Sequence, residues 1–255
     1  MPGEAVGRHR APARPAHDHH RGDRQMTLVM CLPYAGAGAG VYRSWKALAT
    51  DRARAVPIQL PGREEEFSRP RYTSFPECVA DVTRRVTEAA AGEPFAVFGH
   101  SFGGLIAYEV TRHLYETGGP LPERLIVSGT RSPRYRGYSG LSDDDDEAVD
   151  RLKQDSLRGF EALDHPELRA ILLPTLRSDA RLLEQYGDYR PEVCDPLPVP
   201  LTALRGVSDT LATPEGVADW KTFTTEDYAE YEMPGGHLYL LDSMPELWRL
   251  IEEQL

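Results

Sequence analysis

The sequence has no uninterrupted apolar run approaching the roughly 18–20 residues that a helix needs to cross a bilayer, so it predicts no membrane span. Basic residues are also scarce: 29 lysines and arginines stand against 40 aspartates and glutamates, which gives a formal net charge of −11. A nucleic-acid partner usually requires a basic face, and this charge argues against one. The length of 255 residues suits one sizeable core better than two independent domains.

Cysteine is rare as well. Cys31, Cys78 and Cys194 form an odd set with no paired spacing and no secretory signal, which predicts a reducing cytoplasm rather than a disulfide framework. Cys31 lies in an apolar run and Cys78 in a helical pattern, so we expect both to be small buried side chains. Cys194 follows in a proline-rich loop with no neighbouring base to activate it.

The first 25 residues contain five arginines, four histidines and almost nothing to bury. No apolar segment follows the basic start, so it does not match a signal peptide. His17, His19 and His20 offer a loose metal-binding cluster, but a flexible tail or a start codon upstream of Met26 is the favoured interpretation. We therefore predict a tail over residues 1–25 and one folded domain over residues 26–255.

The remaining chain alternates between short apolar runs and helical patterns. This order predicts a mostly parallel sheet covered by helices on both faces. The expected strands are Leu28–Leu32, Ala55–Leu60, Phe95–Phe98, Leu125–Ser128, Leu201–Leu204 and Tyr228–Met233. The expected helices are Val41–Ala49, Glu77–Ala91, the segment after Ser101 to about Leu114, and Pro245–Leu255. Pro57 places the second strand at an edge or in an irregular position.

A polar and helical segment from about 133 to 189 interrupts this rhythm. It is too long for an ordinary connection, so we predict a helical lid over a site. Within it, Ser142 precedes four consecutive aspartates, Asp143–Asp146. Four carboxylates in sequence do not face one another on a helix, whereas a serine followed by acids is typical of a helix N-terminus. We therefore expect a helix start there and no metal site.

The sequence Gly99-His100-Ser101-Phe102-Gly103 lies where an apolar strand ends and a helix begins. A nucleophile elbow requires this position: the serine adopts a strained conformation, and the two glycines give space for the sharp turn. The elbow predicts an α/β-hydrolase fold with Ser101 as the nucleophile. A glycine- and serine-rich turn that merely begins a helix is the alternative.

A serine hydroxyl needs a base to take its proton. His237 follows Gly235 and Gly236 between the last strand and the last helix, which is where this fold places its base. His100 adjoins the nucleophile and should project away from it, while His113 and His165 fall on a helix and in the predicted lid. The alternative for His237 is a structural role in its loop.

The acid that orients the histidine is predicted to be Asp209, which follows the strand Leu201–Leu204 and keeps the chain order Ser, Asp, His. Asp219 and Asp242 stay open as alternatives. For the oxyanion hole we expect the backbone N–H of Phe102, by elbow geometry, and that of Ala35, in the glycine-rich loop after the first strand. This chemistry requires no metal and no organic cofactor.

Several long stretches resemble one family, the type II thioesterases that accompany nonribosomal peptide and polyketide synthases. In order along the chain they are LPYAGAGAGVYRSW, QLPGREEEF, FGHSFGG, ILLPTLRSDARLLEQY, ALRGVSD and MPGGHLYL. The resemblance implies a Ser101–Asp209–His237 triad, an oxyanion hole from Ala35 and Phe102, and a mobile lid over an acyl chamber. Ala37 and the acidic LPGREEEF depart from the family's usual pattern.

The resemblance also implies the reaction: hydrolysis of acyl groups from the phosphopantetheine arm of an acyl or peptidyl carrier protein, which clears stalled or misprimed chains. A carrier is usually acidic, and Arg131, Arg134 and Arg136 are candidates for a basic patch, with ordinary solvated arginines the alternative. Two other functions stay open. One is a chain-releasing thioesterase or small-ester hydrolase, and the other is a non-catalytic binding protein of the same fold.

Overall fold

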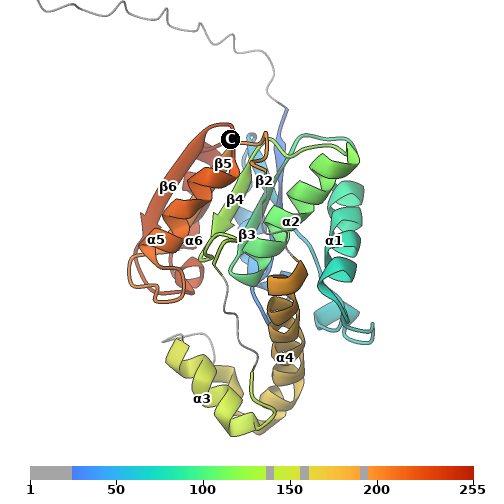
Figure 1. The fold of residues 1–255 in the computed structure, drawn as a ribbon, viewed down its shortest axis with the longest axis vertical. Coiled ribbons are helices and arrows are strands. Elements are labelled where there is room, and N and C mark those ends of the chain that lie inside the picture. Colours follow the sequence, from blue (N-terminus) through green and yellow to red (C-terminus); the bar gives the residue numbers. More distant parts are fainter. Residues whose placement is uncertain (1–24, 136–140, 156–160, 190–194) are drawn as a thin grey trace, which may run out of the picture.

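The computed structural model describes residues 25–135, 141–155, 161–189 and 195–255. At its centre lies a six-stranded parallel sheet with the order β2-β1-β3-β4-β5-β6 (Figure 1). The strands are β1 (Thr27–Leu32), β2 (Ala53–Pro57), β3 (Phe95–His100), β4 (Leu125–Ser128), β5 (Leu201–Gly206) and β6 (Tyr228–Met233). The predicted α/β-hydrolase architecture is confirmed, and Pro57 ends an edge strand, where its missing N–H costs no ladder hydrogen bond.

Helices connect the strands, as the alternating pattern predicts. The α-helices are α1 (Phe75–Ala90), α2 (Phe102–Thr117), α3 (Asp145–Asp155), α4 (Pro166–Tyr189), α5 (Pro214–Ala218) and α6 (Met244–Glu253). The 3₁₀ helices are η1 (Ala39–Leu48), η2 (Glu64–Glu66), η3 (Glu161–Asp164), η4 (Asp219–Phe223) and η5 (Tyr239–Leu241). Apart from the short 3₁₀ turns, only the first expected helix differs in type.

That helix, expected over Val41–Ala49, is the 3₁₀ helix η1. Its N-cap residue, Gly38, offers no side chain, and the first two N–H groups, those of Ala39 and Gly40, donate instead to Gln59 Oε1 and Glu64 Oε2, each at 2.9 Å. The helix uses the tighter i→i+3 hydrogen bonds, which leave three rather than four N–H groups at its start without a partner inside the helix. Tyr42 and Trp45 are still buried on the sheet, so the predicted apolar face is kept.

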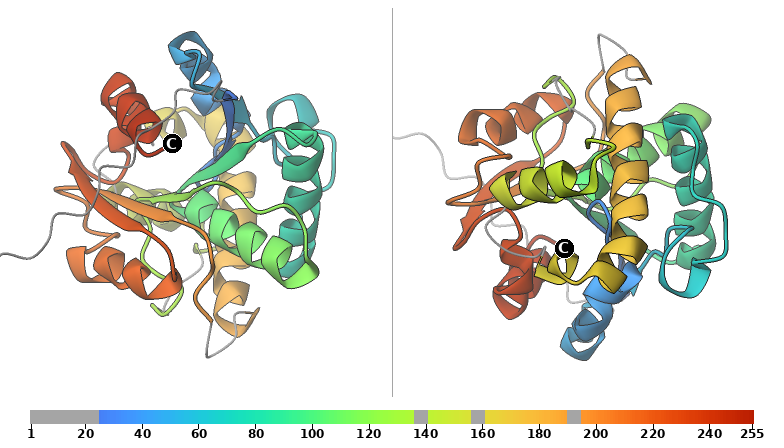
Figure 2. Two further views of the ribbon diagram at one scale, coloured as in Figure 1. Left: turned by 90° about the horizontal axis from the view of Figure 1, so that it is seen from above. Right: turned by 90° about the horizontal axis from the view of Figure 1, so that it is seen from below.

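The core forms two layers, one on each face of the sheet. Alternate residues of β1 separate accordingly: Leu28 and Met30 pack toward α1 and α2, whereas Val29 and Cys31 pack toward η1 and α6. Figure 2 shows these helices on opposite sides of the strands. Cys31 and Cys78 are both free and buried, as expected, and Cys194 lies outside the described residues.

The segment predicted as a lid contains α3, η3 and α4, which lie beyond the carboxyl ends of the strands (Figures 1 and 2). The cap of α3 differs in detail from the prediction. Asp144, not Ser142, caps the helix: its Oδ1 accepts from the N–H groups of Asp146 and Glu147, each at 3.0 Å. Ser142 acts one step earlier, where its hydroxyl accepts from the N–H of Asp144 at 3.1 Å.

Among the helices that the structure describes, none combines the length and the apolar character required to cross a membrane. The predicted tail over residues 1–25 lies outside the described residues except for Gln25. The histidine cluster of that tail, His17, His19 and His20, is outside them as well.

Candidate active site

Ser101 stands at a sharp turn between β3 and α2. Its backbone has φ 54° and ψ −118°, a combination that few L-residues adopt without strain. The turn is closed tightly: a Cβ at Gly99 would lie 2.0 Å from the carbonyl oxygen of Gly103. A Cβ at Gly103 would in turn lie 2.3 Å from the carbonyl oxygen of Leu32. The spacing of the two glycines therefore has the steric cause that the sequence suggests.

The turn brings Ser101 to the side chains of His237 and Asp209. The distance from Ser101 Oγ to His237 Nε2 is 2.9 Å, and His237 Nδ1 lies 2.9 Å from Asp209 Oδ2. An ionised carboxylate only accepts, so His237 Nδ1–H donates to Asp209 and Nε2 is left to accept the Ser101 proton. The three residues are 136 and 28 positions apart along the chain, yet they form one hydrogen-bonded line.

Asp209 is buried, and the protein holds it in its charged form. Burial raises the pKa of its carboxyl, but the hydrogen bond and charge of His237 and the N–H groups of Ala212 and Leu211 outweigh this effect. The pKa of Asp209 therefore lies below its ordinary value. Its second oxygen, Oδ1, accepts from Leu211 N–H at 2.9 Å and from Ala212 N–H at 3.0 Å.

Arg205, at the end of β5, supports this loop and is not among the residues that the sequence predicts for the site. Its Nε donates to the carbonyl of Ala212 at 2.9 Å and its Nη2 to the carbonyl of Asp209 at 3.2 Å. The same guanidinium pairs with Glu232 on β6. The available signal is an arginine inside the otherwise apolar run LTALRG, because a buried charge requires partners.

The loops that carry Asp209 and His237 are joined through their backbones. Val207 N–H donates to the carbonyl oxygen of Met233, and Ser208 N–H donates to that of Gly235, both at 2.9 Å. A Cβ at Gly206 would lie 2.3 Å from the carbonyl oxygen of Gly236, so only glycine permits this approach. The carboxylate and the imidazole are therefore held in register by the fold itself.

His100 is fully buried beside the hydrogen-bonded line, and its ring centroid lies 5.2 Å from that of His237. Its Nδ1 lies 2.8 Å from Ser128 Oγ, which lies 2.6 Å from Tyr239 Oη. Burial lowers the pKa of His100 to about 3, and the nearby His237 charge adds to this effect. His100 is therefore a neutral packing partner beneath the site.

This burial predicts a pH dependence of stability. In the unfolded chain His100 takes up a proton below its ordinary pKa of 6.5, whereas the folded protein takes it up only near 3. The unfolded state binds more protons in that window, so the free energy of unfolding should decrease as the pH is lowered, by up to about 1.4 kcal/mol per pH unit. In a His100→Asn variant we expect the free energy of unfolding to depend less steeply on pH between about pH 6 and pH 4, because the contribution of His100 is removed. Urea unfolding of both proteins across this range measures it, and equal slopes would contradict the prediction.

The other sequence candidates lie elsewhere. His113 is on α2 and His165 directly precedes α4. Asp219 accepts hydrogen bonds from Ser132 and Arg134, and Asp242 ends the 3₁₀ helix η5. Of the three aspartates considered, Asp209 is the one bonded to His237 in the described part of the chain.

The two residues predicted to donate to an oxyanion, Phe102 and Ala35, lie at the start of α2 and in the turn after β1. Phe102 is the first residue of α2, so its N–H has no acceptor within the helix. Ala35 lies in a turn after β1, in which Ala37 N–H donates to the carbonyl of Tyr34 at 3.0 Å. Donors of this kind stabilise the negative charge that develops on a carbonyl oxygen during acyl transfer.

A cavity of about 580 Å³ opens beside the same turn. Apolar groups of the turn, of the segment after η2 and of the predicted lid line it. They include Ala35, Phe67, Leu163, Ile171, Leu172 and Leu176. A cavity of this size and lining suits an acyl chain, and polar groups at its wall include Arg63, Glu64 and Thr175.

Comparison with known proteins gives matches over nearly the whole described domain. Residues 27–255 match the model of a family described as "Thioesterase domain". The chain is similar to the thioesterase PikA5 of Streptomyces venezuelae, with 31% identity over 243 residues that cover 92% of this chain and 83% of PikA5.

Two solved structures are similar as well. One is RedJ, a thioesterase from the prodiginine biosynthetic pathway in Streptomyces coelicolor, with 33% identity and a TM-score of 0.78 over 90% of this chain and 86% of RedJ. The other is BorB, the type II thioesterase from the borrelidin biosynthetic cluster, with 29% identity and a TM-score of 0.77 over 94% of this chain and 95% of BorB. All six strands of the sheet fall within the matched family region.

Proposed function

The chain belongs to the thioesterase family, and we propose that it is a stand-alone type II enzyme that frees acyl groups from the phosphopantetheine arm of carrier proteins. The single observation that carries this proposal is the hydrogen-bonded line from Ser101 through His237 to Asp209. RedJ and BorB, which their descriptions place in the prodiginine biosynthetic pathway and the borrelidin biosynthetic cluster, support the substrate class.

In the proposed first half-reaction, Ser101 Oγ attacks the thioester carbonyl carbon as its proton passes to His237 Nε2. The N–H groups of Ala35 and Phe102 stabilise the oxyanion of the tetrahedral intermediate. When the intermediate collapses, the carbon–sulfur bond breaks, and the departing sulfur takes the proton from His237. The products of this half-reaction are a free pantetheine thiol and an acyl ester on Ser101.

In the second half-reaction, water attacks the acyl ester and gives its proton to His237. The bond to Ser101 Oγ breaks, the serine takes the proton back, and the free acid leaves. Asp209 stays ionised throughout: it fixes the tautomer of His237 and stabilises the imidazolium. The lowered pKa of Asp209 supports this role, because the carboxylate is charged at all pH values near neutrality.

The carrier protein is the proposed macromolecular partner, and the cytoplasm is the proposed location. Of the arginines considered for carrier docking, Arg134 forms an ion pair with Asp219 at 3.0 Å, and the Arg131 guanidinium lies 5.7 Å from the centre of the Tyr135 ring. Arg136 lies outside the described residues. Because a paired arginine attracts an acidic partner less strongly, this patch is a weak docking candidate.

The helical segment from about 133 to 189 is proposed as the lid, and the cavity beneath it as the acyl chamber. The segment contributes Leu163, Ile171, Leu172 and Leu176 to the cavity wall. Apolar walls favour an acyl chain through the area that they remove from water. Chain length should therefore matter to this enzyme.

A Leu172→Trp variant is expected to shorten the acyl chains that are accepted. The larger side chain fills part of the chamber, so kcat/KM for hexanoyl or longer chains should fall about tenfold or more while acetyl hydrolysis is nearly unchanged. Thiol release from a series of acyl-pantetheines measures the ratio. Leu168→Trp is the matched control, because Leu168 is on the same helix, is 43% exposed and is not part of the cavity wall. Equal chain-length profiles for both variants would place the acyl group elsewhere.

The proposed function is tested by comparing acyl-carrier protein, acyl-pantetheine and simple ester substrates, with free thiol or acid as the readout. We expect the carrier-bound thioester to be preferred. Preference for esters over all thioesters would support the small-ester hydrolase instead, and preference for full-length chains over short mispriming groups would support a chain-releasing enzyme. A serine-directed fluorophosphonate should label the wild type and not Ser101→Ala, and an unreactive wild type would favour the binding protein.

A further inference from the structure

Two charged side chains from distant elements meet under the turn Tyr34–Ala37. Arg63 follows β2 and Asp179 lies on α4, 116 residues later. They form a two-bond ion pair, with Nη1 to Oδ2 and Nη2 to Oδ1 both at 2.8 Å. Their side chains are only 6% and 1% exposed. Charges removed from water this completely carry a desolvation cost, and apolar side chains of similar size often give equal or greater stability. Stability alone is therefore a weak reason for this pair.

The pair binds the backbone of the turn on both sides. Gly36 N–H donates to Asp179 Oδ2 at 2.8 Å, and Arg63 Nη1 donates to the carbonyl of Ala37 at 2.9 Å. Each charged group thus satisfies one backbone group of the turn as well as its partner. The bond from Gly36 fixes the orientation of the peptide that links Ala35 to Gly36, because that N–H must face α4.

The turn has the features of type II, with a hydrogen bond from Ala37 to Tyr34 and Gly36 at φ 79° in the third position. Type I and type II turns differ by a rotation of the central peptide, so an acceptor for Gly36 N–H selects between them. Leu176, one helical turn before Asp179, closes on the glycine: a Cβ there would lie 2.4 Å from Leu176 Cδ2. Helix α4 therefore holds this turn by a hydrogen bond and by contact.

Ala35 is the second residue of that turn, and its N–H is a proposed oxyanion donor. This N–H belongs to the Tyr34–Ala35 peptide, which meets the central peptide at the Ala35 Cα, so fixing the central peptide restricts the rotation of its neighbour. Such a donor accelerates the reaction only when its direction is fixed before the charge develops. We propose that Arg63 and Asp179 are positioning residues for the Ala35 N–H, so that the docking of α4 completes the oxyanion hole. This inference rests on the proposed function of the same site.

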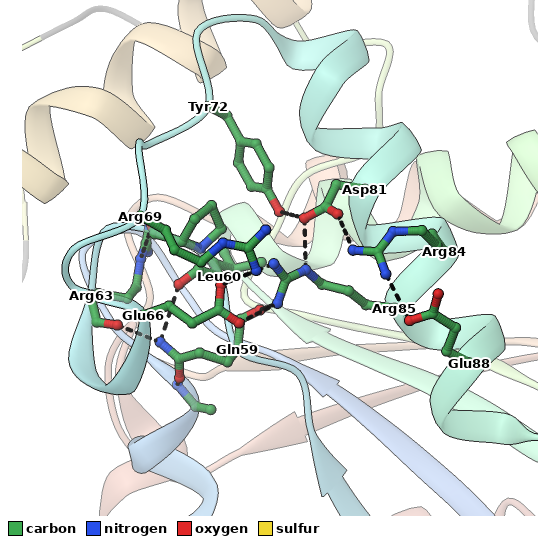
Figure 3. A network of polar contacts seen from close by, with 12 residues as sticks. Gln59, Leu60, Arg63, Glu66, Arg69, Tyr72, Asp81, Arg84, Arg85 and Glu88 are labelled. Atoms are coloured by element: carbon green, nitrogen blue, oxygen red, sulfur yellow. Dashed lines mark hydrogen bonds and ion pairs between the residues drawn. The ribbon is translucent and has the colours of Figure 1, made fainter.

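The segment that carries Arg63 is itself well anchored (Figure 3). Gln59 Nε2 donates to the Arg63 carbonyl at 3.0 Å, and Gln59 Oε1 accepts from Ala39 N–H at 2.9 Å. A few residues on, Arg85 of α1 binds Glu66 through two hydrogen bonds at 2.6 and 3.0 Å. The guanidinium of Arg63 is therefore presented from a fixed backbone.

Asp179 lies on the half of α4 that packs on the body of the protein. After Pro174, Tyr186 donates to the buried Glu109 of α2 at 2.8 Å, and its ring is tilted by 45° against that of Phe75 of α1, with the ring centroids 4.8 Å apart. Before Pro174, Ile171 is 50% exposed. Proline removes a helical hydrogen bond, so the two halves are less tightly connected than in an uninterrupted helix. Asp179, the member of the pair that lies on α4, thus belongs to the anchored half of the predicted lid.

The test separates positioning from stability by comparing two variants. Asp179→Asn leaves Arg63 buried with a neutral partner, and Arg63→Met with Asp179→Leu replaces the pair by apolar side chains. We expect kcat for thioester hydrolysis to fall about 10- to 100-fold in both variants, with KM within about twofold of the wild-type value. Complete loss of one oxyanion donor would lower kcat more, by roughly 100- to 1,000-fold. We expect the thermal midpoint to recover in the double variant, because no buried charge is left unpaired. A double variant with both wild-type stability and wild-type kcat would overturn the inference.

Tyr186→Phe is the matched control, because it removes a hydrogen bond that anchors the same helix to Glu109 of α2 rather than to the turn. Its kcat should stay near that of the wild type although it loses about as much stability as Asp179→Asn. A fall in kcat equal to that of the pair variants would show that any loosening of α4 is enough to lower kcat.

A second readout does not depend on thioester hydrolysis. An alkylboronic acid forms a tetrahedral adduct with Ser101 whose oxygen occupies the oxyanion hole, so both pair variants should bind it about tenfold or more weakly. Unchanged affinity would refute the positioning role, whereas wild type that binds boronate but hydrolyses no thioester would refute only the proposed function.

Discussion

Replacement of His237 by alanine is expected to lower kcat for thioester hydrolysis by about 10⁵- to 10⁶-fold, the largest single effect in the molecule. The imidazole is the sole acceptor within hydrogen-bond distance of Ser101 Oγ in the described residues, at 2.9 Å. Without it, the serine proton has no base to receive it, and the deacylating water has none either. The thioester itself is still bound through the acyl chamber, so KM should change little.

Single-turnover release of pantetheine thiol measures the acylation step, and the release of free acid measures deacylation. His113→Ala, on the outer turns of α2, is the matched control, and its kcat should equal that of the wild type. Asp209 is buried and loses its partner in the His237→Ala variant, so the thermal midpoint has to be measured alongside the rate. A folded variant that keeps more than about 1% of wild-type kcat would exclude His237 as the base.

The parts of this molecule that the sequence predicts well are those with a local cause. Strands and helices alternate along the chain, and the apolar periodicity of each element is set by the face that it buries. The elbow is similarly local, because Gly99 and Gly103 lie within two residues of Ser101 and its turn cannot form with a Cβ at either position. Asp209 and His237 follow from the chain order of strand ends in this fold, and the structure brings both to Ser101.

The parts that the sequence does not predict depend on meetings between distant residues. Arg63 and Asp179 are 116 positions apart, and no spacing within either segment indicates the other. Arg205 supports the loop of Asp209 from within a buried strand, and Ser128, at the end of β4, meets His100. Arg205 and Ser128 are polar residues in or at the end of apolar runs, whereas Arg63 and Asp179 have charged neighbours in the sequence. A polar residue in an apolar run predicts that a partner exists, and only the tertiary structure identifies it.

The shift of the α3 cap from Ser142 to Asp144 has a different cause. Both side chains are acceptors suited to a helix start, and a run of such residues leaves several possible boundaries. Similarly, η1 keeps the apolar face expected of an α-helix while using 3₁₀ hydrogen bonds. Periodicity thus predicts which side chains are buried more reliably than it predicts the hydrogen bonds of the backbone.

Asp209→Asn is expected to lower kcat by about 10⁴-fold at neutral pH while leaving the fold intact. The amide has nearly the same shape, and its oxygen can still accept from Leu211 and Ala212 N–H. Its NH₂ then faces His237 Nδ1 and donates to it, which places the imidazole proton on Nε2. A protonated Nε2 cannot accept the serine proton, so the base is present but in the wrong tautomer.

The same variant tests the charge of Asp209 through pH. The folded-state pKa of Asp209 lies below its ordinary value of 3.8, so its ionisation contributes stability above that value, and this contribution is lost as the pH falls through the lower folded-state pKa. The free energy of unfolding of the wild type should therefore exceed that of Asp209→Asn at pH 7, and the difference should shrink below about pH 4. Urea unfolding at pH 7 and pH 3 measures this difference in stability, and kcat at pH 7 measures the tautomer effect.

Asp242→Asn serves as the control in both the unfolding and the kinetic measurements. A rate within about tenfold of wild type for Asp209→Asn would mean that His237 is oriented by its loop alone.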